Sequence, residues 1–237
     1  MLVSVMHANN ETGAVQPIRE IAAACRRREI PLHTDAAQTV GKIPADVKTL
    51  GVDMMTIVGH KLYGPKGVGA LYVRRGLAIE PVMHGAAHEQ GLRAGTENVP
   101  YIVGLGKACE LASKALNESN TRLADLRDRL EAALTAHHRD VVVHAKNATR
   151  LPNTLSIALP GVSARALLAK VPEICASTGA ACHSGASGIS ATLAAMGVPA
   201  GVAAATLRLT LGWPTSTEEV DLAAERLIGA WESLSGR

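Results

Sequence analysis

Apolar residues in the first half of the chain alternate between strand-like runs and helical spacing. The run at 2–6 predicts a buried strand, and the helical pattern at 18–28 begins just after Pro17, a residue favoured in a first helical turn. This alternation favours a parallel sheet covered by helices. Further strands are predicted near 31–34, at 54–58 and at 68–73.

The second half of the chain mixes both patterns without an internal repeat. A helical stretch at 99–116 is expected to lead into a second unit, whose last helix begins at a capping box of Ser216 and Glu219. We therefore expect a larger α/β domain at 1–115 and a smaller α+β domain at 116–237. The elements predicted in the smaller domain are helices at 119–137 and 163–171 and strands at 141–145, 153–159, 173–177 and 206–211.

Composition is that of a globular protein, with 47% hydrophobic and 19% charged residues among 237. The formal charge is only +3 and the one basic run, at 26–28, lies in a helical pattern, so no nucleic-acid partner is expected. No apolar run reaches transmembrane length and no signal peptide is recognisable, so no membrane partner is expected either. The four cysteines lack zinc-site spacing, and we expect free thiols in a reducing cytoplasm.

Two polar residues stand where predicted strands end. Asp35 follows the strand at 31–34, and Lys61 lies in a glycine-rich connection, GHKLYGPKG at 59–67, after the strand at 54–58. Open α/β sheets place ligand sites at the carboxyl ends of their strands. Taken singly, a helix cap and a solvated lysine are the simpler interpretations. Together the two residues form the pair that pyridoxal phosphate needs, a lysine for its aldehyde and a carboxylate for its ring nitrogen.

Six motifs extend this pair along the chain: MHANNETG at 6–13, HTDAAQ at 33–38, GHK at 59–61, RAGTEN at 93–98, LPNT at 151–154 and STGAAC at 177–182. In their order, and over nearly the whole chain, these motifs resemble the cysteine desulfurases and selenocysteine lyases of the class V aminotransferase group. The resemblance implies an α/β fold of the aspartate aminotransferase type. A remnant of the large cofactor-binding domain would be followed by a small C-terminal α+β domain that carries the catalytic cysteine loop.

The resemblance implies that the first half of the chain holds pyridoxal 5′-phosphate. Lys61 matches the lysine that binds the cofactor's aldehyde, and Asp35 matches the partner of the pyridinium nitrogen. Gln38 matches the residue that bonds the phenolic oxygen. Asn10 matches an asparagine that lies near both that oxygen and the substrate carboxylate.

Other matched residues would hold the phosphate and the substrate. His60 matches a phosphate ligand, and Thr96 matches a residue that reaches the phosphate of the other subunit's cofactor, which implies a homodimer. Arg208 matches the arginine that clamps the substrate carboxylate, a task suited to a planar guanidinium. Its neighbours at 207–211 form a strongly apolar strand, so a buried partner is expected.

Cys182 also has a case independent of the resemblance. It lies in a run of small residues at 177–188, where nothing is bulky enough to bury the thiol. Cys25, Cys109 and Cys175 occur in apolar helix or strand patterns, which are typical of buried cysteines. A nucleophilic thiol must be accessible and able to ionise, and we expect that Cys182 alone is accessible.

The function implied is conversion of L-cysteine to L-alanine. The sulfur would remain on Cys182 as a persulfide, for transfer to an acceptor such as an iron–sulfur scaffold protein. Two alternatives stay open. One is a selenocysteine lyase, towards which Val58 and ACHS at 181–184 lean, and the other is an inactive fragment that acts as an interaction module.

The family pattern also includes a long stretch ahead of the asparagine motif, with a phosphate-binding turn and a ring stacked on the cofactor. Neither occurs before Asn10, so we expect an N-terminally truncated chain that binds the cofactor weakly or not at all on its own. No resident metal is expected, because His84, His88 and Glu89 have no apparent further ligand. A transient role of Cys182 as an iron–sulfur ligand is left open.

Overall fold

The computed structural model describes residues 1–179 and 190–236, which form two compact units. The first unit comprises Met1–His7 and Gln16–Leu116. The second comprises Ala8–Val15 and Asn117–Arg237, so a short turn near the start of the chain belongs with the C-terminal half.

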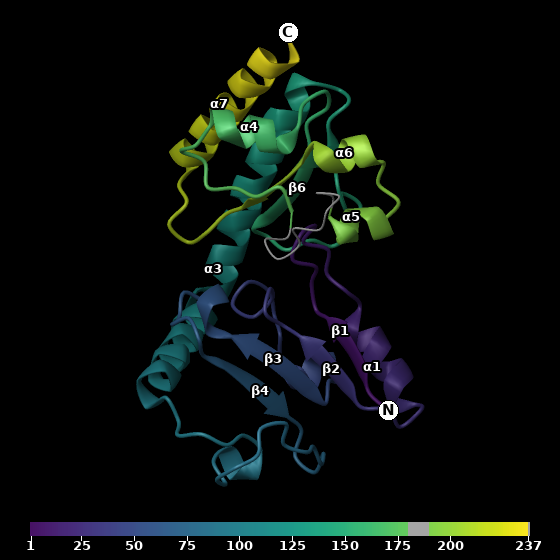
Figure 1. The fold of residues 1–237 in the computed structure, drawn as a ribbon, viewed down its shortest axis with the longest axis vertical. Helices are drawn as coiled ribbons and strands as arrows, with labels where there is room; N and C mark the ends of the chain where they lie inside the picture. The colour runs from purple at the N-terminus through teal and green to yellow at the C-terminus, as the bar shows by residue number, and fades with distance from the viewer. Residues whose placement is uncertain (180–189, 237) are drawn as a thin grey trace. The chain divides into compact units, whose positions relative to one another are not determined.

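The first unit is built on a four-stranded sheet in the order β1-β2-β3-β4 (Figure 1). The strands are β1 (Val3–Met6), β2 (Leu32–Asp35), β3 (Met54–Val58) and β4 (Gly69–Val73). As predicted, β1, β2 and β3 are parallel, but β4 runs antiparallel to β3. The expectation of a parallel sheet is wrong for β4, because the connection at 59–68 is shorter than the dozen or so residues that a crossover needs.

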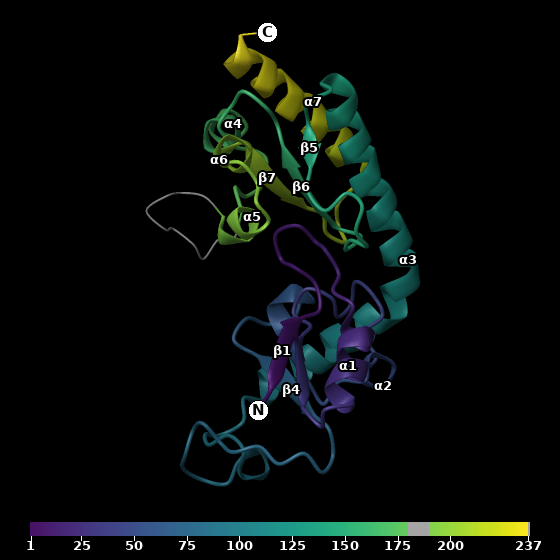
Figure 2. The ribbon, with the colours of Figure 1, turned by 90° about the vertical axis from the view of Figure 1, so that its right-hand side faces the viewer.

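Helices cover one face of this sheet, as Figure 2 shows for α1 (Ile18–Arg26) and α2 (Val47–Leu50). Ile18, Ala22 and Cys25 recur at helical spacing and are all buried, which gives α1 one apolar stripe for the sheet. On the opposite face of the sheet, Asp35 is exposed. On the same face Met6 is 44% exposed and Leu71 is 51% exposed, whereas Met54 is buried.

The second unit is built on a three-stranded antiparallel sheet in the order β5-β6-β7. The strands are β5 (Val142–Val143), β6 (Thr154–Ala158) and β7 (Thr206–Thr210). All side chains of β6 are buried, as expected for a central strand with both faces covered. The core around it includes Leu155, Ile157, Leu207, Leu227 and Trp231.

One long helix, α3 (Val99–His137), runs from the first unit into the second. The prediction of separate helices at 99–116 and 119–137 is wrong. The residues between them, Asn117 and Glu118, are polar but are neither glycine nor proline, so nothing in the sequence breaks the helix there.

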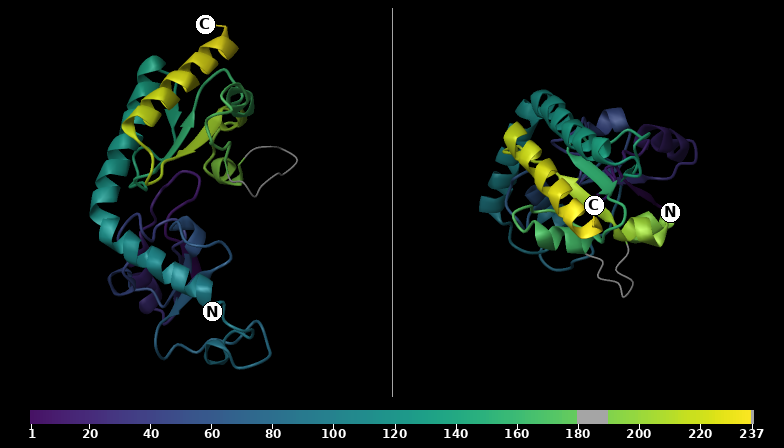
Figure 3. Two further views of the ribbon diagram at one scale, coloured as in Figure 1. Left: turned by 90° about the vertical axis from the view of Figure 1, so that its left-hand side faces the viewer. Right: turned by 90° about the horizontal axis from the view of Figure 1, so that it is seen from above.

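The last helix, α7 (Thr217–Ser235), lies beside the C-terminal half of α3 (Figure 3). Arg129 on α3 donates two hydrogen bonds to the carboxylate of Asp221 on α7, from Nε at 2.5 Å and from Nη2 at 2.7 Å. These bonds connect the two helices. The predicted capping box is confirmed: Ser216 and Glu219 bond reciprocally at the start of α7.

Three short helices complete the second unit: α4 (Ala164–Lys170), α5 (Ala191–Ala195) and α6 (Ala200–Ala204). The predicted strand at 173–177 is wrong, since only Ser177 pairs there, through an isolated bridge to Arg208. Pro172 has no N–H to donate, and the next residues form local turn bonds instead. In the described part of the chain, no helix is both long and apolar enough to cross a membrane.

Truncation of the second unit's core should be costly. Leu207 is 0% exposed, whereas Leu222 on the outer side of α7 is 49% exposed. We expect Leu207→Ala to lower the free energy of unfolding by about 2–5 kcal/mol, because it leaves a cavity beside β6. Leu222→Ala, the matched control, should change it by less than about 0.5 kcal/mol. Urea unfolding of both variants checks this, and equal losses would contradict the packing described.

Candidate active site

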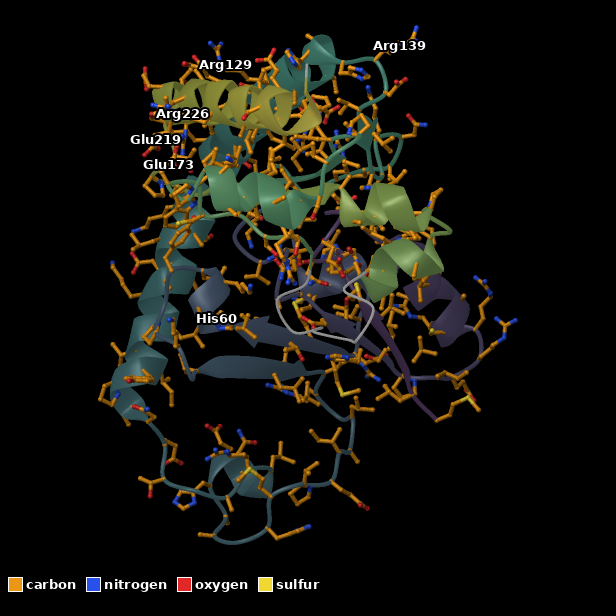
Figure 4. All side chains as sticks on the ribbon, turned by 45° about the horizontal axis from the view of Figure 1, so that its top comes forward. His60, Arg129, Arg139, Glu173, Glu219 and Arg226 are labelled. Atoms are coloured by element: carbon orange, nitrogen blue, oxygen red, sulfur yellow. The ribbon has the colours of Figure 1, made fainter. Side chains whose placement is uncertain are left out.

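The carboxyl ends of β1, β2 and β3 meet at one edge of the first unit's sheet, because the three strands are parallel. Met6, Asp35 and Thr56 are register partners at this edge. β3 then passes directly into a 3-10 turn, η1 (Gly59–Lys61), which carries both His60 and Lys61. Figure 4 shows His60 just beyond the end of β3. The predicted acid and the predicted lysine thus end neighbouring strands of one sheet.

Asp35 is exposed at the end of β2, and one of its carboxylate oxygens is engaged locally. Oδ1 accepts a hydrogen bond from the Ala37 amide at 2.8 Å. This is the capping bond that the simpler interpretation expected, although it begins a turn and not a helix. The bond uses one oxygen, and within the described residues the other has no protein hydrogen bond. A ring nitrogen could therefore donate to Asp35 without displacing the cap.

The turn that carries Lys61 is held tightly from beneath. Gly59 accepts two amide hydrogen bonds, from Leu62 at 2.9 Å and from Gly64 at 3.0 Å. A Cβ added to Gly59 would lie 2.9 Å from the Pro65 carbonyl oxygen, so only glycine fits this close approach. Leu62 is 3% exposed and anchors the turn, while Lys61 before it is exposed. The lysine therefore projects from a backbone that cannot easily shift.

A second lysine, Lys42, lies near Lys61 and was not found from the sequence. Its Nζ donates to the Gln38 carbonyl oxygen at 3.0 Å. Burial, and then the positive charge of Lys61, lower the pKa of Lys42 to about 8. The turn that carries Lys42 contacts the turn that carries Lys61 at Gly41, where an added Cβ would lie 2.8 Å from Leu62 Cδ2.

Two lysines without an ion-pair partner among the described residues, and an unsatisfied imidazole, belong to the surroundings of this edge. Among the described residues, no carboxylate forms an ion pair with Lys42 or Lys61. His7, directly after β1, is 3% exposed, and its Nδ1 has no hydrogen-bond partner in the described chain. Burial lowers the pKa of His7, so the imidazole is neutral near pH 7. Uncompensated ammonium groups at such an edge attract an anionic ligand such as a phosphate.

The second unit brings together two other predicted residues, Asn10 and Arg208. Arg208 is half-buried on β7, and its Nη1 donates to the Asn10 carbonyl oxygen at 3.1 Å. Its backbone is paired with Ser177, whose carbonyl oxygen accepts from the Arg208 amide at 2.7 Å. A guanidinium has five N–H donors, so one such bond leaves others for a carboxylate ligand.

The cysteines differ from expectation at one position. Cys182 lies outside the described residues. Cys25 is buried, and Cys109 is partly buried, where burial raises the pKa of its thiol. Cys175, however, is exposed, so the expectation that Cys182 alone is accessible is wrong. The cause is the missing strand at 173–177, which leaves Cys175 on surface turns.

The remaining predicted residue, Thr96, is exposed on an irregular segment before α3. Of the histidines on the same segment, His88 accepts a bond from the Gly95 amide at 3.3 Å through Nδ1. Across the described residues there is no group of three or more side chains that could hold a metal ion.

A lysine and an acid at adjacent strand ends match the pair that pyridoxal-phosphate-dependent enzymes use for the cofactor's aldehyde and ring nitrogen. The Aminotransferase class-V family matches residues 1–222, and the chain belongs to this family.

The relatives support this assignment. A cysteine desulfurase IscS of Methanosarcina thermophila is 45% identical over 228 residues, which are 95% of this chain and 56% of the relative. A solved NifS-like protein from Rickettsia africae ESF-5 has a TM-score of 0.88 and 34% identity, covering 100% of this chain and 62% of its own. A solved SspA in complex with cysteine has a TM-score of 0.73 and 33% identity, and the match covers 89% of this chain and 58% of the SspA chain. The chain therefore spans little more than half of these relatives' length. The similarity to the solved structures confirms the predicted fold.

The cofactor of this family is pyridoxal 5′-phosphate, and the strand-end residues of the first unit fit it. Asp35 has a carboxylate oxygen available for the ring nitrogen, and Lys61 has an exposed amine without an ion-pair partner among the described residues. The second ammonium, on Lys42, adds positive charge for an anionic group.

The lowered pKa of Lys42 predicts a pH-dependent stability difference. The pKa falls from 10.5 to about 8 on folding, so between these pH values the folded chain binds fewer protons than the unfolded chain. The free energy of unfolding therefore rises with pH in this window, and the cost of the buried charge is fully present below pH 8. Lys42→Met should remove that slope, which amounts to about 1–3 kcal/mol across the window.

The measurement is urea unfolding of wild type and variant at several values between pH 7 and pH 10.5. Lys48→Met, at an exposed position on α2, is the matched control and should keep the wild-type slope. Parallel curves for wild type and Lys42→Met would show that this lysine is not desolvated.

Proposed function

We propose that the chain acts as a pyridoxal-phosphate-dependent cysteine desulfurase, which converts L-cysteine to L-alanine and keeps the sulfur as a persulfide on Cys182. The observation that carries the proposal is the placement of Asp35 and Lys61 at the ends of neighbouring strands. It is supported by relatives that are named cysteine desulfurases and by a similar structure solved with cysteine.

The first unit would hold the cofactor. Lys61 Nζ would bind its aldehyde, the available oxygen of Asp35 would accept the proton of the ring nitrogen, and Gln38 would bond the phenolic oxygen. Phosphate contacts would come from His60 and, across a homodimer, from Thr96. When bound, pyridoxal phosphate supplies an electron sink that weakens bonds next to the substrate's α-carbon. Lys61 Nζ, once released, would carry the proton that leaves the α-carbon.

The second unit would hold the substrate and accept the sulfur. Arg208 would bind the carboxylate of L-cysteine through the N–H groups that its bond to Asn10 leaves unused. The Cys182 thiolate would attack the substrate's sulfur, so that a sulfur–sulfur bond forms while the carbon–sulfur bond breaks. The electron pair stays with the carbon, which takes up a proton to become the methyl group of alanine.

The persulfide would then pass to a protein acceptor, such as an iron–sulfur scaffold. A reducing compartment such as the cytoplasm suits this chemistry, because thiols there stay reduced. In keeping with this, none of the three described cysteines forms a disulfide.

The role of Lys61 is tested by trapping. Incubation with pyridoxal phosphate, borohydride reduction and peptide mapping should place the pyridoxyl group on Lys61. Lys61→Ala should abolish the label, because no other exposed lysine follows a strand beside an acid. Lys66→Ala, in the same glycine-rich connection, is the matched control and should keep the label. A label on Lys66 or Lys42 with none on Lys61 would refute the assignment.

The role of Cys182 is tested against Cys175, which is the exposed one of the three described cysteines. With pyridoxal phosphate supplied, Cys182→Ser should lower alanine release from L-cysteine by roughly 100-fold or more, since no persulfide can form. Cys175→Ser should retain wild-type release. Near-normal release by Cys182→Ser would remove the central residue of the proposal.

The same assay with L-selenocysteine separates the alternatives. Release by Cys182→Ser from selenocysteine, but not from cysteine, is compatible with a desulfurase, because the carbon–selenium bond is weaker. A wild-type chain that carries the cofactor on Lys61 and releases alanine only from selenocysteine is a lyase. A chain that carries the cofactor on Lys61 and releases alanine from neither amino acid is an inactive fragment.

A further inference from the structure

Glu11 is a buried carboxylate that pairs with hydroxyls in place of a cation. It is 5% exposed, and in the described part of the chain it has no ion-pair partner. Carboxylates are rarely this buried without a compensating charge. Its Oε2 accepts from Ser190 Oγ at 2.5 Å, and its Oε1 accepts from Thr192 Oγ1 at 2.7 Å. Both oxygens are therefore committed to one short stretch of chain at the start of α5.

The same carboxylate also contacts the chain at Gly179. A Cβ added there would lie 3.2 Å from Glu11 Oε2, so the backbone passes directly against this oxygen. The φ of Gly179 is +135°, a conformation that other residues rarely adopt. Gly179 and Ser190 are the described residues on either side of 180–189. One buried side chain thus contacts both ends of that segment.

Glu11 is held rigidly enough to serve as an anchor. Its amide donates to Asn9 Oδ1 at 2.9 Å, and the Thr12 amide donates to the same oxygen at 2.8 Å. The turn is bonded to the second unit at Gly13, whose carbonyl oxygen accepts from the Leu151 amide at 2.8 Å, shortly before β6. A Cβ added to Gly13 would lie 3.0 Å from Cβ of Thr154, so the turn also packs against the first residue of β6.

We infer that Glu11 is a positioning residue that holds the chain at Gly179 and Ser190 together and so fixes where the segment that carries Cys182 leaves and rejoins the second unit. This inference rests on the proposed function in so far as Cys182 accepts the sulfur. Asn10, the neighbour of Glu11, contacts Arg208 from the same turn. The turn would thereby keep the sulfur acceptor in register with the group that binds the substrate carboxylate.

The test uses thiol chemistry of the 237-residue chain, which requires no cofactor. The alkylation rates of Cys182 and Cys175 with iodoacetamide are measured by mass spectrometry in wild type, Glu11→Gln, Thr192→Val and the double variant. Loss of one hydrogen bond to a charged group should raise the rate at Cys182 roughly tenfold. Cys175 should change less than about twofold, because it lies outside the contacts of Glu11.

The double variant should match the stronger single variant, since both changes break the same contact. Thr135→Val is the matched control: it removes a hydroxyl on α3 of the second unit that bonds only local carbonyl oxygens, and it should leave both rates unchanged. Glu11→Asp, which keeps the charge, should restore part of the wild-type rate.

Unchanged Cys182 rates in folded Glu11→Gln overturn the inference. If Glu11→Gln does not fold, Thr192→Val and Ser190→Ala decide by the same criterion, because each keeps the carboxylate. In a sample loaded with pyridoxal phosphate, Thr192→Val should lower kcat for L-cysteine and leave KM unchanged. A general loss of stability would not produce this selective effect on kcat. Failure of the desulfurase proposal would be seen in alanine release from Cys182→Ser, and it would leave the alkylation result intact.

Discussion

The side-chain oxygen of Asn9 is the acceptor on which the second unit's part of the site depends. It takes hydrogen bonds from the amides of Glu11 and Thr12 and from the Thr12 hydroxyl, and so closes a tight turn. Without it, partly buried amides would lose their partners, at about 1–3 kcal/mol each. Because the turn is closed, the Asn10 carbonyl oxygen accepts a hydrogen bond from Arg208, and the carboxylate of Glu11, the next residue, accepts one from Thr192 on α5. A few residues distant in sequence from the C-terminal half thus organise its polar groups.

The predicted site residues are divided between two units that each have their own core. The first unit holds the strand-end acid and lysine on a sheet backed by α1, where the apolar cluster includes Ile18 and Leu32. The second holds the arginine on β7, next to the fully buried strand β6. In such a division the groups that tune a cofactor can be fixed independently of those that bind a substrate carboxylate. Each set then depends on local packing, which keeps its geometry stable.

How far the sequence predicted these features depended on how local each one is. Strands β1 to β3, and Asp35 and Lys61 at their ends, follow from apolar runs and from what comes directly after them. The direction of β4 and the continuity of α3 depend on connection length and on the absence of a helix breaker, which apolar periodicity does not measure. Lys42 and Glu11 act through contacts with residues 19 and about 180 positions away, so no local pattern could reveal them. The predicted burial of Cys175 is wrong because the apolar run at 173–177 forms surface turns and not a strand.

A nucleophile that must meet a substrate atom has little tolerance for misplacement, since a shift of about 1 Å can cost two orders of magnitude in rate. The residues on either side of Cys182 in the sequence are small, so the inferred constraint comes from the described residues that flank this segment. Glu11 meets this need with a charged acceptor, whose bonds to hydroxyls are stronger than those of a neutral amide. A glutamine in its place would present one acceptor and one donor to two hydroxyl groups, and one hydroxyl would have to reorient. That hydroxyl's own hydrogen would then lose its acceptor, whereas a carboxylate accepts from both hydroxyls at once.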